Sequence, residues 1–127
     1  MKSAEQIKSL LAHCYGSVNY HKWSPLFRKH VLTDGAHTVA QECQAYWLMD
    51  AIASYSKKTK HEEFQLWTLT VKDNAAILTC DDGNGNILVT QEIPYTDFPL
   101  NEIQLYCQLG SIDGVNPVWV IMLLSEY

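Results

Sequence analysis

Residues 64–80 read FQLWTLTVKDNAAILTC, and this stretch is the strongest indication of the fold. Its first half, Phe64 to Val71, is rich in aromatic and β-branched residues, and its second half, Ala75 to Cys80, is again mostly apolar. Asp73 and Asn74 between them favour a tight turn. Two such runs joined by a short turn predict an antiparallel β-hairpin.

Further strands are predicted after this hairpin. A turn-rich stretch at residues 81–86 precedes the alternating run Ile87 to Ile93, which extends the hairpin to a three-stranded meander. Ile103 to Leu109 is a fourth candidate strand, and Val118 to Leu124 is an uninterrupted apolar run, as in a strand covered on both faces. The second half of the chain therefore predicts a sheet of four or five strands, mainly antiparallel.

Helices are predicted in the first half. Residues 3–13 begin with Ser3 and Gln6, the spacing of a capping box, and continue with an apolar face. A second helix is expected from about Thr33 to Tyr55, and residues 17–33 are expected to be an irregular connection. The prediction is an α+β fold, a single globular domain over residues 1–127, with two N-terminal helices packed on the sheet.

Composition narrows the class of protein. A chain of 127 residues with 47% hydrophobic and 18% charged residues is typical of one globular domain. The chain has no apolar run of membrane-spanning length and begins without the apolar core of a signal peptide, so we expect a cytoplasmic protein. The cysteines are widely spaced and are expected to be reduced and mostly buried: Cys14, Cys43, Cys80 and Cys107.

Charge is distributed unevenly along the chain. Residues 1–61 carry eight lysines and arginines against four acids, whereas residues 62–127 carry one lysine against ten acids. The total of −5 argues against non-specific binding of nucleic acid, which depends on neutralising phosphates. This asymmetry can mark a binding face. Alternatively, the fold can intersperse the basic residues of the first half with the acidic residues of the second half over one surface.

The segment from Tyr20 to His30 is the densest group of candidate binding residues. Aromatic rings stack on bases, and arginine or lysine holds phosphates; Arg28 is the only arginine in the chain. The alternative is a connection whose aromatic residues anchor it to the core while its charges face water. The candidates for binding a ligand or partner are Tyr20, His21, Lys22, Trp23, Arg28, Lys29 and His30.

Asp50 is a second candidate because it lies in an apolar stretch and is expected to be buried. A buried carboxylate needs a partner, so Asp50 is interpreted as an anchor for the 20–33 connection, or else as a catalytic or ligand-binding group. Metal ligands usually occur in close-set pairs, which the four histidines at positions 13, 21, 30 and 37 do not form with Cys14 or Cys43. No metal site and no cofactor are therefore predicted.

Several sequence blocks resemble a family of small bacterial proteins, carried also on plasmids and phages, whose domain has no assigned function. The resemblance covers about residue 20 to the C-terminus and implies a prokaryotic or mobile-element origin, without catalytic roles to transfer. The segment from Gly110 to Pro117 looks longer than this family pattern. The blocks that carry the resemblance are TDG at 33–35, AYWLMDAIAS at 45–54, FQLW at 64–67, GNGN at 83–86, IPYTDFPL at 93–100 and LLSEY at 123–127.

These observations favour a non-catalytic binding protein that sequesters a host protein or an anionic small molecule such as a nucleotide, as a phage or mobile-element inhibitor would. The alternative is a small hydrolase or nucleotide-processing enzyme that uses Asp50 and a histidine from the 13–37 region. A second alternative is an acidic mimic of DNA built from residues 62–127. The sequence leaves a homodimer open.

Overall fold

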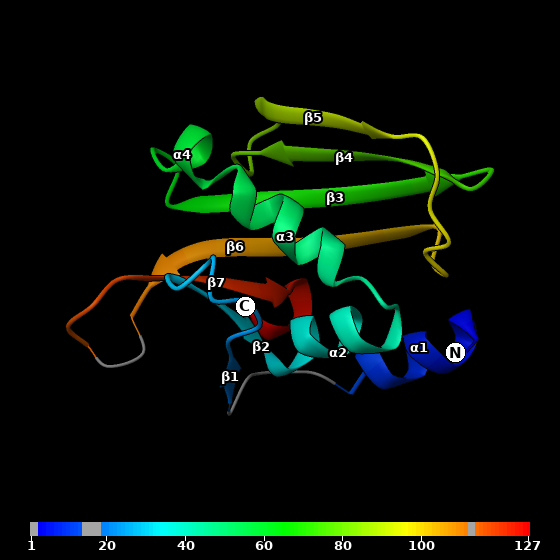
Figure 1. Cartoon of the computed structure of the whole chain (residues 1–127), viewed down its shortest axis with the longest axis horizontal. Helices are drawn as coiled ribbons and strands as arrows, with labels where there is room; N and C mark the ends of the chain where they lie inside the picture. The colour runs from blue at the N-terminus through cyan, green and yellow to red at the C-terminus, as the bar shows by residue number, and fades with distance from the viewer. Residues whose placement is uncertain (1–2, 14–18, 112–113) are drawn as a thin grey trace.

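The main element of the computed structural model is a mixed β-sheet covered by helices on one face (Figure 1). The structure describes residues 3–13, 19–111 and 114–127. The helices are α1 (Ala4–Leu11), α2 (Asp34–Glu42), α3 (Tyr46–Ser54), α4 (Ser56–Thr59) and the 3-10 helix η1 (Leu124–Glu126). The strands are β1 (Tyr20–His21), β2 (His30–Thr33), β3 (Phe64–Lys72), β4 (Ala75–Asp81), β5 (Ile87–Ile93), β6 (Glu102–Gly110) and β7 (Val118–Leu123).

The strand order across the sheet is β1-β2-β7-β6-β3-β4-β5. All neighbours are antiparallel except β2 and β7, which run parallel. The predicted meander is confirmed as β3, β4 and β5, and the predicted strands at 103–109 and 118–124 are β6 and β7. The α+β class is therefore confirmed.

The predicted number of strands is wrong, because the described residues form seven. The two additional strands, β1 and β2, come from the 17–33 segment that was expected to be irregular. All four residues of β2 are buried, and its parallel partner β7 lies almost ninety residues further along the chain. A strand this short depends on its neighbour for backbone hydrogen bonds, so its own sequence carries little periodic signal.

The predicted second helix is divided into α2 and α3. Gln44 adopts a left-handed backbone conformation with φ of 50°, and the amide of Ala45 donates to the carbonyl of Ala40 at 2.8 Å. A left-handed residue is a common way to end a helix, but glycine or asparagine usually occupies that position. Because glutamine does not favour this conformation, the sequence does not predict the break between α2 and α3.

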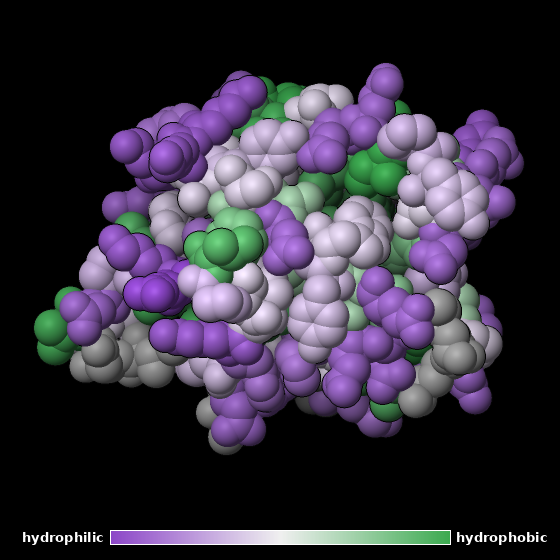
Figure 2. All heavy atoms as spheres, viewed as in Figure 1, coloured by the Kyte–Doolittle hydropathy of each residue, from purple (hydrophilic) through white to green (hydrophobic). Residues whose placement is uncertain are grey.

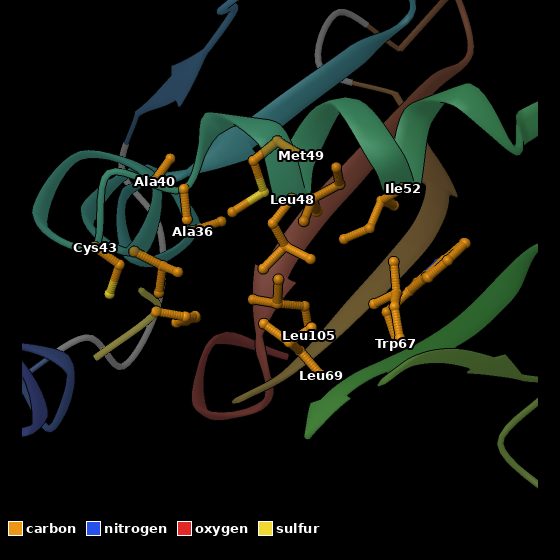
Figure 3. Packing of buried hydrophobic residues seen from close by; sticks show 14 of the residues in the cluster. Ala36, Ala40, Cys43, Leu48, Met49, Ile52, Trp67, Leu69 and Leu105 are labelled. Atoms are coloured by element: carbon orange, nitrogen blue, oxygen red, sulfur yellow. The ribbon is translucent and has the colours of Figure 1, made fainter. Parts of the chain in front are cut away.

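The core lies between α3 and the helix-facing side of the sheet. Leu48 and Ile52 of α3 point toward Trp67 of β3 and Leu105 of β6, while Met49 of the same helix points toward α2 (Figure 3). All five side chains are at most 2% exposed. Burial of apolar surface at this layer is the main stabilising contribution to the fold.

The buried polar groups of β3 are hydrogen bonded. The indole nitrogen of Trp67 donates to Gln65 Oε1 at 3.0 Å, and Gln65 Nε2 donates to the carbonyls of Thr59 and Glu62, both at 3.0 Å. These bonds tie the end of α4 and the residues that follow it to the sheet. A buried amide needs such partners to offset the loss of water.

The C-terminus is joined to the start of α2 through Glu126. The carboxylate accepts from Thr33 Oγ1 at 2.6 Å, from the Gly35 amide at 2.9 Å and from the Leu123 amide at 3.0 Å. Thr33 also caps α2 by accepting from the Ala36 amide. A Cβ at position 35 would overlap the Glu126 carboxylate and Leu123, so a larger residue there requires these side chains to shift. We name the contacts of Thr33, Gly35 and Glu126 the terminal junction.

The described cysteines Cys43, Cys80 and Cys107 are free and buried, as predicted, whereas Cys14 lies outside the described residues. Burial raises the pKa of the Cys43 thiol to about 11 and that of Cys80 to about 12, and it also raises the pKa of Cys107. Such thiols are weak nucleophiles. Within the part of the chain that the structure describes, no helix is long and apolar enough to span a membrane.

Candidate functional site

The segment between β1 and β2, residues 22–29, forms a turn on the surface. The Phe27 amide donates to the Ser24 carbonyl at 3.3 Å, and the His30 amide donates to the Phe27 carbonyl at 3.2 Å. Its far end is fixed to the sheet, because the Trp119 amide donates to the Lys29 carbonyl at 2.7 Å. The turn is therefore held at a defined place beside β7.

Aromatic rings anchor this turn. The ring of Trp23 stacks on Phe27 with centroids 6.0 Å apart and meets the edge of His30 at 6.4 Å, while His30 stacks on Trp119 at 6.5 Å. His30 is buried, and burial lowers the pKa of its imidazole, so it is neutral at pH 7. Trp23 and His30 thus fit the alternative interpretation of this segment, in which its aromatic residues anchor it to the core.

The charged residues of the same turn point to solvent. Lys22, Arg28 and Lys29 are exposed and line a pocket of about 490 Å³, which we name the cationic pocket. Its walls are completed by Val31, Asn116, Pro117 and Val118. Across residues 3–13, 19–111 and 114–127, the ion pairs are His21–Asp34 and His61–Glu62, so no carboxylate there neutralises the three cations. The turn lies towards the left of Figure 1, and Figure 2 shows hydrophilic atoms interspersed with hydrophobic ones over this side of the molecule.

A second pocket, the polar pocket, has a volume of about 450 Å³ and adjoins the first at Lys22, which lines both. The other lining residues are Trp23, Ser24, His37, Tyr46 and Asp50. They come from the turn, from α2 and from α3, so only the tertiary structure brings them together.

Asp50 is exposed, which corrects the prediction that it is buried. The core-facing side of α3 is formed by Leu48, Met49 and Ile52, and helical geometry places residue 50 away from them. Its Oδ1 accepts from the indole nitrogen of Trp23 at 2.8 Å. Asp50 therefore contacts the 20–33 segment as expected, but through a side chain at the surface.

Two histidines extend this polar arrangement towards β1. His21 Nε2 lies 2.8 Å from Asp34 Oδ1, and its ring stacks on His37 with centroids 4.2 Å apart. His37 Nε2 lies 3.3 Å from the Tyr46 hydroxyl. The pKa of His37 is lowered, chiefly by burial and then by His21, while Asp34 opposes the shift. A neutral His37 can exchange hydrogen bonds with a ligand without adding charge.

The sequence prediction missed the contribution of His37 and Tyr46 to this pocket. Tyr46 and Asp50 are four residues apart, a spacing that places both on one face of a helix and could have paired them. His37 offered no comparable signal. Tyr20, by contrast, pairs with Thr33 at the sheet edge and lines neither pocket as the described residues outline them.

Metal-ligating side chains do not cluster in the described part of the chain: it holds no group of three or more histidine, cysteine, aspartate or glutamate residues placed to bind a metal ion.

Comparison with protein families gives a match to a family of unknown function (DUF6876) over residues 5–127. The chain belongs to this family. The resemblance seen in the sequence blocks is thus confirmed, and the match extends further towards the N-terminus than those blocks do. Comparison of this DUF6876 chain with curated proteins and with solved structures gives no match.

Proposed function

We propose that this DUF6876 chain is a non-catalytic binding protein that captures an anionic ligand in the cationic pocket. The observation that supports the proposal is the convergence of Lys22, Arg28 and Lys29 on one pocket without a neutralising carboxylate among the described residues. Arginine suits this role because its planar guanidinium binds phosphate or carboxylate through two parallel hydrogen bonds. The chain has a net charge of −5, so this local excess of positive charge supports a site for an anionic ligand.

The size of the cationic pocket favours a small molecule over an acidic protein segment. Its volume of about 490 Å³ falls within the range of small-molecule sites, roughly 300–1,000 Å³. Val31, Pro117 and Val118 supply an apolar wall, and the anchored turn supplies cations that are already in place. Preorganisation of this kind lowers the entropic cost of binding.

The test is a titration of the protein with inorganic phosphate, followed by calorimetry at low and at 0.1 M salt. Arg28→Ala is expected to weaken binding by about 1.5–3 kcal/mol, the scale of a charged hydrogen bond. Added salt is expected to weaken binding in the unmodified protein, because exposed charges are screened within about 10 Å at 0.1 M. Lys72→Ala, which removes an exposed charge from the β3–β4 hairpin, is the matched control and should bind normally. Equal binding by both variants would contradict the proposal.

A hydrolase or nucleotide-processing enzyme is the second candidate, because Asp50 and His37 line the same polar pocket. In this alternative His37 would act as general base beside the carboxylate. Incubation with phosphomonoesters and phosphodiesters distinguishes the two functions: product that disappears in Asp50→Asn and His37→Gln variants would replace binding by catalysis as the main activity. The acidic DNA mimic is less well supported, since Asp81 and Asp82 use their carboxylates on the turn amides of Gly83, Asn84 and Asn86.

A further inference from the structure

We infer that the ligand of the cationic pocket is a small amphipathic anion, a phosphate or carboxylate that carries a short apolar tail. This inference rests on the proposed function and adds the part of the ligand that lies beyond its charged group. Its structural basis is a strip of apolar side chains beside the cations, formed by Val31, Val118 and Val120, which we name the valine strip. The cations bind the charged group, and the valine strip receives the tail.

The valine strip lies on the sheet face that the described helices leave open (Figure 1). Leu32 of β2 pairs with Ile121 of β7, and both belong to the hydrophobic core. Side chains alternate between the two faces of a strand, so Val31 and its partner Val120 point to the opposite face, and so does Val118. The cationic pocket, which Val31 and Val118 line, therefore opens on this face of the sheet.

An aromatic cluster bounds the valine strip on its far side. Val120 pairs with Gln108 of β6, and Gln108 pairs with Phe64 of β3. The ring of Phe64 lies 4.7 Å from that of Tyr106 and 5.3 Å from that of Tyr127, measured between centroids. Two strand spacings, about 10 Å, separate Val120 from Phe64. The strip therefore has a limited length, which suits a short tail better than a long acyl chain.

The open face changes from apolar to polar with distance from the cations. The polar residues at its other end are those usual for a sheet face in contact with water: Thr68, Thr70, Thr79 and Gln104. Glu92 and Glu102 are exposed at that same end. Charge on this face is thus positive beside the valine strip and negative at the opposite end, which orients an anionic ligand with its charged group at the turn.

The walls of the cationic pocket favour a hydrocarbon tail over a sugar. Val31, Pro117 and Val118 have no hydrogen-bonding group in their side chains. A hydroxyl placed against them loses hydrogen bonds to water and finds no replacement there. A methylene in the same place is removed from water, which tightens binding by about fourfold for each fully buried group.

The experiment measures by calorimetry the affinities for inorganic phosphate, propyl phosphate, hexyl phosphate and glycerol 3-phosphate. Glycerol 3-phosphate is the matched polar ligand, because it has as many carbons as propyl phosphate but carries hydroxyls. We expect propyl phosphate to bind at least ~10-fold more tightly than glycerol 3-phosphate, and hexyl phosphate to bind more tightly still. Equal affinities for propyl phosphate and glycerol 3-phosphate would overturn the inference. Binding to phosphatidylglycerol vesicles without binding to hexyl phosphate would also overturn it, in favour of a membrane surface.

Variants of the open face separate this inference from the proposed function. Val118→Thr replaces a methyl of the valine strip by a hydroxyl and should lower the ratio of hexyl phosphate affinity to inorganic phosphate affinity by about threefold. Ile77→Thr is the matched control, since Ile77 is exposed at the polar end of the same face, and it should preserve that ratio.

An unchanged ratio in Val118→Thr would overturn the inference, while a loss of phosphate binding in Arg28→Ala would still support the proposed function. Absence of phosphate binding in the unmodified protein would overturn both.

Discussion

The terminal junction and the cationic pocket differ in how their polar groups are satisfied. At the junction, the Glu126 carboxylate accepts three hydrogen bonds, from Thr33, Gly35 and Leu123. At the cationic pocket, Lys22, Arg28 and Lys29 project to solvent and no described carboxylate pairs with them. Both regions involve residues from the same short part of the chain. The polar groups of the junction have partners within the protein, whereas the cations of the pocket are available to a ligand.

This difference separates residues that stabilise the fold from residues available to a ligand. A satisfied, half-buried carboxylate contributes to stability and has little capacity left for another partner. Exposed, unpaired cations contribute little to stability, and a ligand can use them without breaking an existing contact. Substitutions at the two regions should therefore affect different measurements.

The largest expected effect on stability is that of Gly35→Ala. The added Cβ would overlap the Glu126 carboxylate and Leu123, so we expect a loss of about 3 kcal/mol in the free energy of unfolding, the upper end of the range for overpacking. Urea denaturation measures this change. Gly110→Ala is the matched control, because a Cβ there meets no atom within 4 Å, and it should unfold nearly as the unmodified protein does. Similar stabilities for the two variants would mean that the junction is not closely packed.

The next effect is expected from Glu126→Ala. Removal of the carboxylate leaves the Gly35 and Leu123 amides without their acceptor, whereas the Thr33 hydroxyl still donates to the Ile121 carbonyl. We expect a loss of about 2 kcal/mol in the free energy of unfolding. The same substitution removes the group that a Cβ at position 35 would overlap, so the double variant with Gly35→Ala should lose less stability than the two single losses combined. Strict additivity would contradict the coupling of these residues.

Mild acid should destabilise the protein through His30 and His37. Burial lowers the pKa of both imidazoles below the ordinary value of 6.5, so the unfolded chain takes up protons that the folded chain does not. Their effect on the free energy of unfolding is absent above pH 7, where both imidazoles are neutral in the folded and the unfolded chain. The free energy of unfolding then decreases as the pH falls below 6.5 towards the lowered pKa values. Thermal melting between pH 5 and pH 8 measures the trend, and His30→Gln should flatten it. An unaltered trend in that variant would exclude His30 as a cause.

The smallest effect on stability is expected from Arg28→Ala. Because the side chain is exposed and unpaired among the described residues, the free energy of unfolding should change by less than about 0.5 kcal/mol, although phosphate binding is strongly weakened. Trp23→Ala is the informative contrast, since it removes the aromatic anchor and should lower the melting temperature. If Arg28→Ala lowered the melting temperature as much as Trp23→Ala, the claim that the cations of the pocket do not stabilise the fold would be wrong.

Elements that depend on residues close together in the chain were predicted correctly, whereas those that depend on distant residues were not. Strands β3, β4 and β5 were located to within about one residue, because a hairpin is specified by its own alternation and turns. The capping box of Ser3 and Gln6 was predicted correctly for the same reason, since it involves residues three apart. The Tyr20 to His30 segment was identified by its unusual side chains alone, and three of them do line one pocket.

From the sequence alone, the α+β class, the central meander and the candidate segment from Tyr20 to His30 could be predicted, because each is marked by residues that are neighbours in the chain. Tertiary packing places Asp50 at the surface, pairs β2 with β7, and brings His37 and Tyr46 to the same pocket as Lys22. These relations join residues that are distant in the chain, and no local pattern encodes the partner of an exposed side chain or of a four-residue strand. Close packing of α3 on the sheet settled which face of the helix is buried, and with it which residues remain for a ligand.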